Sequence, residues 1–242
     1  MRQLDALCDL LGRNNRLWHD GRSQIGLIHK IPDMQNRKLW SLILKRLAIA
    51  GLAAVPLMAS AKTIMVLGDS ISAGYGMKPE QGWVQLLQKR LDQQYPKQHK
   101  VVNASVSGET TSGALARFPK LLQTYKPHVV VIELGGNDGL RGQPPQMIEK
   151  NLGQLVQQAK ASKAKVLLFG MKIPPNYGAA YSQSFENTYK RVSQQYQVKL
   201  MPFFMEGIAG NKTLMQADLV HPNSKAQMRL LNNAYPYIKG AL

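Results

Sequence analysis

The sequence predicts an α/β protein in which a parallel β-sheet is covered by helices. From Thr63 onward, short apolar or β-branched runs alternate with longer amphipathic stretches, which is the pattern of strands and helices that follow one another along a parallel sheet. Each of the first three runs also ends in a loop of small residues. In a parallel sheet such loops meet where the carboxyl ends of the strands lie, and functional groups gather there.

Five short apolar runs are predicted to be the strands of this sheet. They span residues 63–68, 100–104, 128–134, 164–170 and 197–202. Between them, apolar side chains recur at helical spacing, for example over residues 83–91 and 148–159. A last helix is predicted near residues 224–238, with Asn223 as a plausible N-terminal cap.

The composition predicts one folded domain. The chain has 242 residues, of which 44% are apolar, and this size suits a single α/β core. Residues 62–242 contain no internal repeat, low-complexity tract or Pro/Gly-rich linker. We therefore expect a single domain over residues 62–242.

The segment before this domain has the layout of a secretory signal peptide. Residues 34–61 begin with basic side chains, continue with an apolar run from Leu47 to Met58 and end in Ala-Ser-Ala, which is an A-x-A cleavage site. The apolar run has 12 residues, whereas a transmembrane helix needs about 20, so a permanent membrane span is the weaker interpretation. We expect cleavage after Ala61 and export to the periplasm.

Residues 1–33 do not fit a signal peptide, because such a peptide starts close to its basic region. Met34 would make a better start. Two interpretations stay open: translation begins near Met34, or residues 1–33 form an unstructured extension.

The chain is strongly basic, with a formal net charge of +17, of which residues 62–242 retain +12. Its Lys and Arg residues are spread along predicted helix faces with few aromatic neighbours, so a solvated surface is the first interpretation. Weak association with an anionic membrane surface is the second, and nucleic-acid binding is not expected.

The only cysteine, Cys8, lies outside the domain, and we expect no disulfide, metal site or cofactor. The oligomeric state stays open.

Three residues have the properties of a catalytic triad. Ser70 follows the first predicted strand in a Gly-Asp-Ser turn that can expose its hydroxyl group. Asp218 lies three residues before His221, on a loop that Pro222 biases away from helix. The carboxylate can therefore accept the Nδ1 hydrogen, which leaves Nε2 to face the nucleophile.

Hydrolysis of an ester also requires donors for the oxyanion of the tetrahedral intermediate. Gly108 can offer a backbone N–H that no side chain blocks, and Asn137 can offer its amide hydrogens from the end of the third strand. With the N–H of Ser70 this makes three donors. They come from three loops at the same edge of the sheet, as an oxyanion hole requires.

Four ordered blocks resemble the signature blocks of the SGNH, or GDSL, hydrolase superfamily. They are GDSIS at 68–72, Gly108 within NASVSGET, GGND at 135–138 and DLVH at 218–221. The stretches between the blocks look like the multifunctional thioesterase I, lysophospholipase and arylesterase type of that family. The resemblance covers nearly all of residues 62–242 and none of residues 1–61.

This resemblance implies a fold, an activity and a set of roles. The implied fold is a three-layer, flavodoxin-like α/β/α sandwich on a five-stranded parallel sheet, and the implied activity is hydrolysis of small acyl esters and thioesters. The family's roles fall on Ser70 as nucleophile, on Gly108 and Asn137 as oxyanion donors, and on Asp218 and His221 as the other triad members. Singly, Ser70 could be a helix cap and Gly108 a turn residue, but the ordered set favours the catalytic interpretation.

Two other functions are compatible with parts of this pattern. A carbohydrate O-deacetylase on the same scaffold would share the triad but would have a more polar cleft. A noncatalytic nucleotide-binding module is disfavoured, because GDSISAGYG lacks the Gly-x-Gly-x-x-Gly spacing and the lysine of a phosphate-binding loop.

The remaining ionisable residues near the predicted strands are given other roles. Asp69 and Asp138 flank the expected site, and we expect both to order loops and not to act as acids in the reaction. His99 and His128 precede strands, so they should lie at the opposite edge of the sheet from the site.

The loops beside the triad indicate a binding cleft for an acyl chain. Leu140 follows Asn137 in a loop flanked by glycines, while Ile173 and Pro174 follow the fourth strand. We expect these three residues to wall the cleft, with no dense set of polar groups nearby to bind a head group. The alternative is that Leu140 and Ile173 belong to the core and the cleft is short.

Overall fold

The computed structural model describes residues 61–242. The predicted extension over residues 1–33 and all but the last residue of the predicted signal peptide lie outside the described residues. No helix among residues 61–242 is long and apolar enough to cross a membrane.

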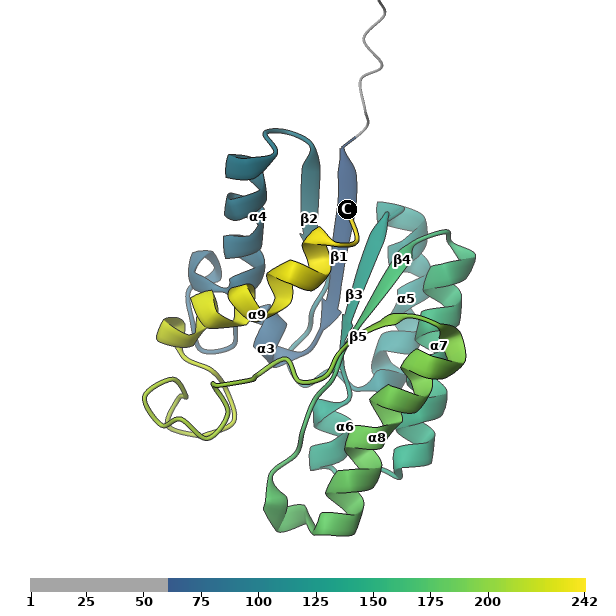
Figure 1. Ribbon diagram of the computed structural model, residues 1–242, viewed down its shortest axis with the longest axis vertical. Coiled ribbons are helices and arrows are strands. Elements are labelled where there is room, and N and C mark those ends of the chain that lie inside the picture. Colours follow the sequence, from purple (N-terminus) through teal and green to yellow (C-terminus); the bar gives the residue numbers. More distant parts are fainter. Residues whose placement is uncertain (1–60) are drawn as a thin grey trace, which may run out of the picture. The chain divides into compact units, whose positions relative to one another are not determined.

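The centre of the fold is a five-stranded sheet in which every paired strand is parallel (Figure 1). The strands are β1 Lys62–Gly68, β2 His99–Asn103, β3 Val129–Glu133, β4 Lys165–Phe169 and β5 Lys199–Met201. Their order across the sheet is β2-β1-β3-β4-β5. All five predicted strands are confirmed, and β5 is shorter than expected because only Lys199–Met201 pairs with β4.

Helices cover both faces of the sheet and give the predicted three-layer sandwich. The α-helices are α3 Ser70–Ala73, α4 Trp83–Gln94, α5 Thr111–Tyr125, α6 Gly136–Leu140, α7 Pro145–Ala161, α8 Ala179–Tyr196 and α9 Gln227–Lys239. Short 3-10 turns occur at η1 Pro79–Gln81, η2 Pro175–Tyr177 and η3 Ser224–Ala226. Helices α4 and α9 lie on one face, and α5, α7 and α8 lie on the other (Figure 1).

The core explains why the strand sequences are almost continuously apolar. Every residue of β3 is buried, as are residues 64–68 of β1, because helices shield both faces of the central strands. Between the sheet and α9, the buried rings of Trp83, Phe169 and Phe204 lie within 6.4 Å of one another, centroid to centroid.

The last predicted helix is confirmed as η3 followed by α9. Asn223 caps it as expected, since its side chain accepts a hydrogen bond from the backbone N–H of Lys225. The cap ends an irregular segment, residues 202–223, which begins after β5 at the carboxyl edge of the sheet. We use "carboxyl edge" for the side where the strands end and "amino edge" for the side where they begin.

Candidate active site

Ser70 is the first residue of α3, directly after β1 ends at the carboxyl edge. The turn is held by Asp69, whose Oδ1 accepts a hydrogen bond of 3.0 Å from the backbone N–H of Ile71. This contact caps α3 and fixes the chain direction on both sides of Ser70. Asp69 therefore orders the loop, as the sequence analysis expected.

Asp218 and His221 form a compact unit within one turn of the loop. Asp218 Oδ1 accepts hydrogen bonds from the backbone N–H groups of Val220 at 2.9 Å and His221 at 3.0 Å. Its Oδ2 lies 2.6 Å from His221 Nδ1. Partial burial raises the pKa of Asp218, but the hydrogen bonds from the His221 backbone, the His221 ring and the Val220 backbone outweigh burial and lower the pKa to about 2.

This ionisation state fixes the direction of the hydrogen bonds along the three residues. A carboxylate only accepts, so His221 donates from Nδ1, and in the neutral ring Nε2 is then an acceptor. Ser70 Oγ lies 2.9 Å from Nε2 and can donate to it. A continuous chain of hydrogen bonds therefore runs from Ser70 through His221 to Asp218.

The two predicted oxyanion residues lie on neighbouring loops. Asn137 is in α6 and its Nδ2 donates to the carbonyl oxygen of Glu109 at 3.0 Å and to Asp69 Oδ2 at 3.3 Å. Gly108 has a φ of 76° and an exposed backbone, and its carbonyl oxygen accepts from Arg141 Nη2 at 3.2 Å. Asn137 lines the same cleft as Ser70, whereas Gly108 lies just outside the cleft wall, next to Glu109.

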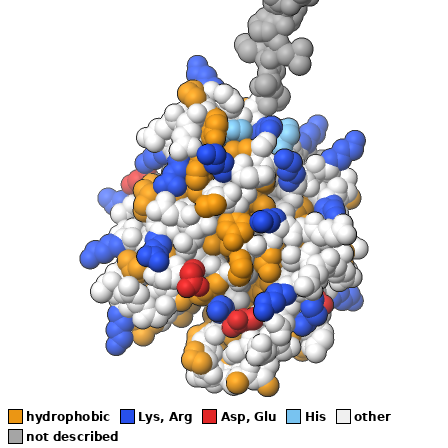
Figure 2. Space-filling view, viewed as in Figure 1, with side chains coloured by type: hydrophobic (Ala, Val, Ile, Leu, Met, Phe, Trp, Pro, Cys, Tyr) orange, Lys and Arg blue, Asp and Glu red, His pale blue; other side chains and the backbone are white. Residues whose placement is uncertain are grey.

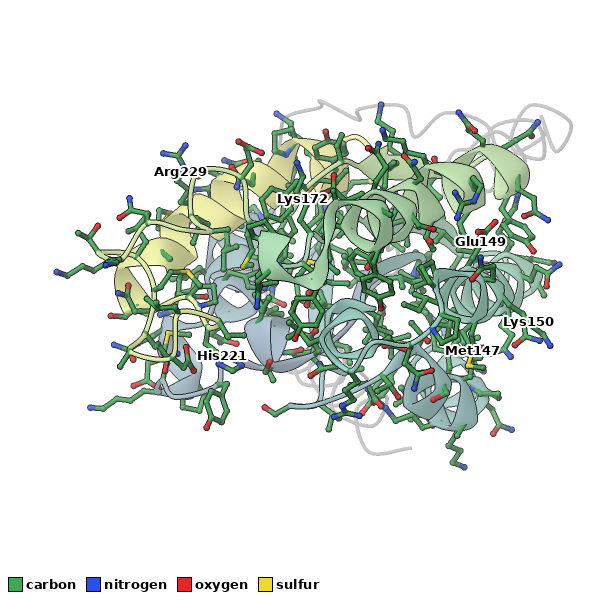
Figure 3. The ribbon with its side chains drawn as sticks, turned by 90° about the horizontal axis from the view of Figure 1, so that it is seen from below. Met147, Glu149, Lys150, Lys172, His221 and Arg229 are labelled. Atoms are coloured by element: carbon green, nitrogen blue, oxygen red, sulfur yellow. The ribbon has the colours of Figure 1, made fainter. Side chains whose placement is uncertain are left out.

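A cleft of about 540 Å³ opens beside Ser70 and His221 at the carboxyl edge. Leu140, Ile173 and Pro174 all line it. The opposite wall comes from the irregular segment 202–223 and is largely apolar; it includes Phe203, Met205, Met215, Leu219 and Val220. Figure 3 looks onto this edge and shows His221 and Lys172, another lining residue, on separate segments of the chain.

Asp138 ties the loop after β3 to the start of α5. Its carboxylate accepts from the backbone N–H of Thr111 at 2.9 Å and from the Thr111 hydroxyl at 2.6 Å. Asp138 therefore has the loop-ordering role that was expected of it.

His99 and His128 lie at the amino edge, as predicted. His99 begins β2, and His128 precedes β3, where its Nδ1 accepts from the backbone N–H of Thr63 at 3.0 Å. Within the part of the chain that the structure describes, no three His, Cys, Asp or Glu side chains are grouped so that they could hold a metal ion.

A match to a sequence profile assigns this chain to a protein family. The profile of the GDSL-like Lipase/Acylhydrolase family matches residues 66–229, which include every residue of the hydrogen-bonded chain. The chain belongs to this family. It is therefore an acylhydrolase, and the implied sandwich fold is the one observed.

Named relatives of this acylhydrolase span nearly the same residues. It is 50% identical over 203 residues to esterase TesA of Pseudomonas aeruginosa, a match that covers 82% of this chain and 100% of the relative. It is 44% identical over 169 residues to thioesterase 1/protease 1/lysophospholipase L1 of Escherichia coli K12, which covers 70% of this chain and 79% of the relative. A crystal structure of TesA matches with a TM-score of 0.73 and 51% identity, over 75% of this chain and 100% of the crystallised chain.

The sequence analysis missed a buried carboxyl group next to the turn at residues 69–72 of this acylhydrolase. Glu133 ends β3, is fully buried and accepts from the Ser72 hydroxyl at 2.6 Å. Burial, together with the nearby Asp69 carboxylate, raises the pKa of Glu133 well above its usual range. A charged residue inside the otherwise apolar run HVVVIEL was the signal that could have revealed it.

Two further residues that hold His221 in place were also missed. The Tyr75 ring lies 4.5 Å from the His221 ring, centroid to centroid, although Tyr75 is half exposed. Gln216 donates from Nε2 to the carbonyl oxygens of Tyr75 at 2.8 Å and Pro222 at 3.2 Å. Neither position has a local sequence signal, because both contacts join segments far apart in the chain.

Proposed function

We propose that this acylhydrolase is a serine esterase and thioesterase in which Ser70 is the nucleophile, His221 the general base and Asp218 the group that orients and stabilises the His221 ring. The observation that carries the proposal is the hydrogen-bonded chain from Ser70 Oγ to Asp218 Oδ2 at the mouth of an apolar cleft. Activation of a serine hydroxyl requires a ring nitrogen that accepts its proton, here His221 Nε2, and an acceptor for the other ring nitrogen, here the Asp218 carboxylate.

The geometry leads to a two-step reaction. Ser70 Oγ attacks the acyl carbon while its proton moves to His221 Nε2, and the carbonyl oxygen becomes an oxyanion. The tetrahedral intermediate then breaks its bond to the leaving group, which takes the proton from His221 and departs as an alcohol or a thiol. Water repeats the sequence on the acyl-serine and releases the carboxylic acid.

The oxyanion is assigned to the backbone N–H groups of Ser70 and Gly108 and to the side-chain amide of Asn137. One Asn137 hydrogen is bound to the Glu109 carbonyl at 3.0 Å, while the contact to Asp69 is 3.3 Å, beyond the usual range for such a bond. The second hydrogen is therefore the one that an oxyanion can take over, and the Glu109 contact keeps the amide oriented meanwhile.

The cleft favours an acyl chain as the bound group. Leu140, Ile173 and Pro174 form one wall and the side chains of segment 202–223 form the other, so the acyl chain replaces water along an apolar surface. Each buried CH₂ contributes about 0.8 kcal/mol, so kcat/KM should rise with acyl length until the cleft is filled. The leaving group lies outside this wall, and both oxygen esters and thioesters should be cleaved. The relatives named as an esterase and as a thioesterase and lysophospholipase support this range.

The test is hydrolysis of p-nitrophenyl esters from acetate to palmitate, with acyl-CoA and lysophospholipid as further substrates. We expect the wild type to prefer medium or long chains and Ile173→Ala to shift the preferred length, with Ile173→Val between the two. A fluorophosphonate probe should label Ser70 and should not label Ser70→Ala. A preference for acetate together with cleavage of acetylated sugars would favour the carbohydrate O-deacetylase instead.

We also propose that the chain is exported to the periplasm after cleavage following Ala61. The basic and apolar order of residues 34–61 and the A-x-A site support this, and the full length of TesA matches only 82% of this chain, which supports a start near Met34. Mass spectrometry of the protein isolated from the periplasm should give Lys62 as its first residue. Intact residues 34–61 on the active protein would contradict cleavage.

A further inference from the structure

The amino edge of the sheet carries lysines within the first two residues of four strands or in the turn just before β3 and β4. We call these six side chains the lysine face: Lys62, Lys100, Lys126, Lys163, Lys165 and Lys199. All six are exposed. Because the strands are parallel and begin at one edge, these charges from distant parts of the sequence lie together on one side of the molecule.

The lysine face has no Asp or Glu partner within the described part of the chain, while Lys62 donates to the backbone oxygen of Leu242 and Lys165 to that of Ala241 at 2.8 Å. None of the four ion pairs there includes one of the six lysines. Nine of the ten Asp and Glu residues of 61–242 lie toward the carboxyl edge: Glu133 ends β3, and the other eight lie in carboxyl-edge loops or in the half of a helix nearer that edge. The exception is Asp92, near the end of α4, which Gln88 binds. Figure 2 shows Lys and Arg around the end where β1 begins, and further Lys and Arg side chains over the rest of this face.

The positive field of this face acts on a neighbouring side chain. His99 begins β2, and its pKa is lowered by burial and by the charge of Lys62. Like charges that gather without partners repel one another and favour binding of an anionic surface that neutralises them.

We propose that the lysine face is a docking surface for an anionic lipid bilayer. Charge complementarity supports this, because six exposed lysines that form no ion pair with an acidic side chain match a surface of anionic head groups. This complementarity is independent of the proposed export.

The attachment is electrostatic and leaves the cleft open to water. Most exposed large apolar side chains, such as Leu219 and Tyr75, belong to the carboxyl edge, and Tyr125 is the one near the amino edge among the described residues. Binding therefore involves little insertion and weakens as salt screens the charges. Because the active site lies at the opposite edge, the bound enzyme acts on substrates that arrive from the aqueous side.

The experiment uses residues 62–242, which contain the whole five-stranded sheet and the helices that cover it, and a relative that matches over 75% of this chain forms a complete crystallised chain. Sedimentation with phosphatidylglycerol/phosphatidylcholine vesicles measures binding, and hydrolysis of a water-soluble p-nitrophenyl ester measures activity. The test variant replaces Lys100, Lys126 and Lys163 by Gln. The control replaces Lys78, Lys212 and Lys225, three exposed lysines at the carboxyl edge, and so has the same net charge.

Each lysine close to an anionic surface contributes roughly five-fold to affinity, so the test variant should bind at least ten-fold more weakly and the control within about two-fold of wild type. Both variants should keep wild-type activity, vesicle-bound enzyme should stay active, and raising NaCl to about 0.5 M should release it. Equal loss of vesicle binding in the two variants would show that net charge and not the lysine face drives binding. Loss of activity on vesicle binding would show that the carboxyl edge, and not the lysine face, contacts the bilayer. Tighter binding to duplex DNA than to vesicles at equal phosphate concentration would overturn the assignment to a bilayer. None of these results depends on the identity of the acyl substrate.

Discussion

The two edges of the sheet use left-handed backbone conformations in different ways. At the amino edge, each of the four turns from helix to strand contains a non-glycine residue with positive φ: Lys97, Lys126, Lys163 and Gln197. At the carboxyl edge, eight glycines have positive φ, among them Gly108 beside the site. The amino-edge residues accept a modest strain in the turn after a helix, whereas most carboxyl-edge turns use glycine, which adopts a positive φ without strain; Leu219, with a φ of 57°, is the non-glycine exception there.

Buried polar groups are distributed in the same way. Asp69, Glu133 and Asp138 are all nearly inaccessible, and all lie at the carboxyl edge. Burying carboxyl groups costs stability unless they are hydrogen-bonded or neutral, and all three accept hydrogen bonds here. The difference teaches that the buried carboxyl groups of this fold are concentrated beside the candidate site, whereas the opposite edge keeps its charged side chains in solvent.

The largest difference between the edges should appear in the activity of variants at the carboxyl edge, Ser70 and His221, compared with a variant of His128 at the amino edge. Ser70→Ala and His221→Ala should each lower kcat by about 10⁴-fold or more, because triad members act as a unit. His128→Ala at the amino edge should leave kcat unchanged and lower the melting temperature slightly, since it removes only the hydrogen bond from Thr63. Circular dichroism confirms folding of all three variants, and near-wild-type turnover of Ser70→Ala would remove the basis of the proposed mechanism.

Loss of one oxyanion donor should have the next largest effect. Asn137→Ala should lower kcat by about 10²–10³-fold with little change in KM, because the amide acts on charge that develops only in the transition state. Steady-state kinetics on a single p-nitrophenyl ester measures both constants. A rise in KM at constant kcat would show instead that Asn137 binds the substrate in its ground state.

The buried carboxyl groups should make stability depend on pH. Burial raises the pKa of Asp69 from its ordinary value of 3.8 to about 6, so the folded state binds a proton more tightly than the unfolded state does. The free energy of unfolding should therefore fall as the pH rises from about 4 to above 6, by up to about 3 kcal/mol from this residue. Urea unfolding at pH 4.5 and 7.5 should show a smaller fall for Asp69→Asn. Asp92→Asn at the amino edge is the control and should parallel wild type.

Removal of an exposed tyrosine ring should lower kcat at the carboxyl edge and should not change it at the amino edge. Tyr75→Ala should lower kcat by up to about ten-fold, because an aromatic pair contributes about 0.5–1.5 kcal/mol and here it holds the His221 ring toward Ser70. Tyr75→Phe keeps the ring and should retain activity within two-fold. Tyr125→Ala, an exposed tyrosine at the amino edge, should have no effect on kcat. Equal losses in Tyr75→Ala and Tyr75→Phe would assign the effect to the hydroxyl group.

The smallest effect concerns the strained turns themselves. Gln197 has a φ of 51° at the end of α8, so Gln197→Gly should raise the free energy of unfolding by about 0.5–1 kcal/mol. Gly108→Ala, at a φ of 76°, should lower it by about 1 kcal/mol. Thermal denaturation measures both. If both variants changed the free energy of unfolding in the same direction, strain from a side chain at positive φ could not be the cause of both changes.

Much of the fold could be predicted because local signals and the global arrangement agree. The run that became β3 is apolar on both faces, as a strand covered by two helix layers must be, and Asn223 marks the start of the last helix by its own chemistry. Ser70 and the Asp218–His221 loop were predictable because each lies beside a recognisable strand end or proline.

The rest of the site depends on contacts that no local pattern encodes. Segment 202–223 has no regular periodicity, yet it supplies one wall of the cleft and Gln216. Tyr75 becomes relevant only when this segment folds back over α3. In the sequence, Glu133 has the position of an exposed polar residue at the end of a strand. Its burial results from the packing of the turn at residues 69–72 against it. Sequence reasoning therefore finds the candidate reacting groups before it finds the residues that pack around them.

The Asp218–His221 turn has a consequence for how activity appears during folding. Asp218 and His221 are paired by short-range contacts within four residues, helped by Leu219 at a φ of 57°, so this pair can assemble before the domain is complete. The contact between His221 Nε2 and Ser70 Oγ is different, because it spans 151 residues and needs the last part of the chain to dock on the first strand. Hydrolysis is thus a built-in reporter of the final long-range closure: in a refolding experiment, turnover should return only when the two ends of the domain have met, after most of the helix signal has recovered.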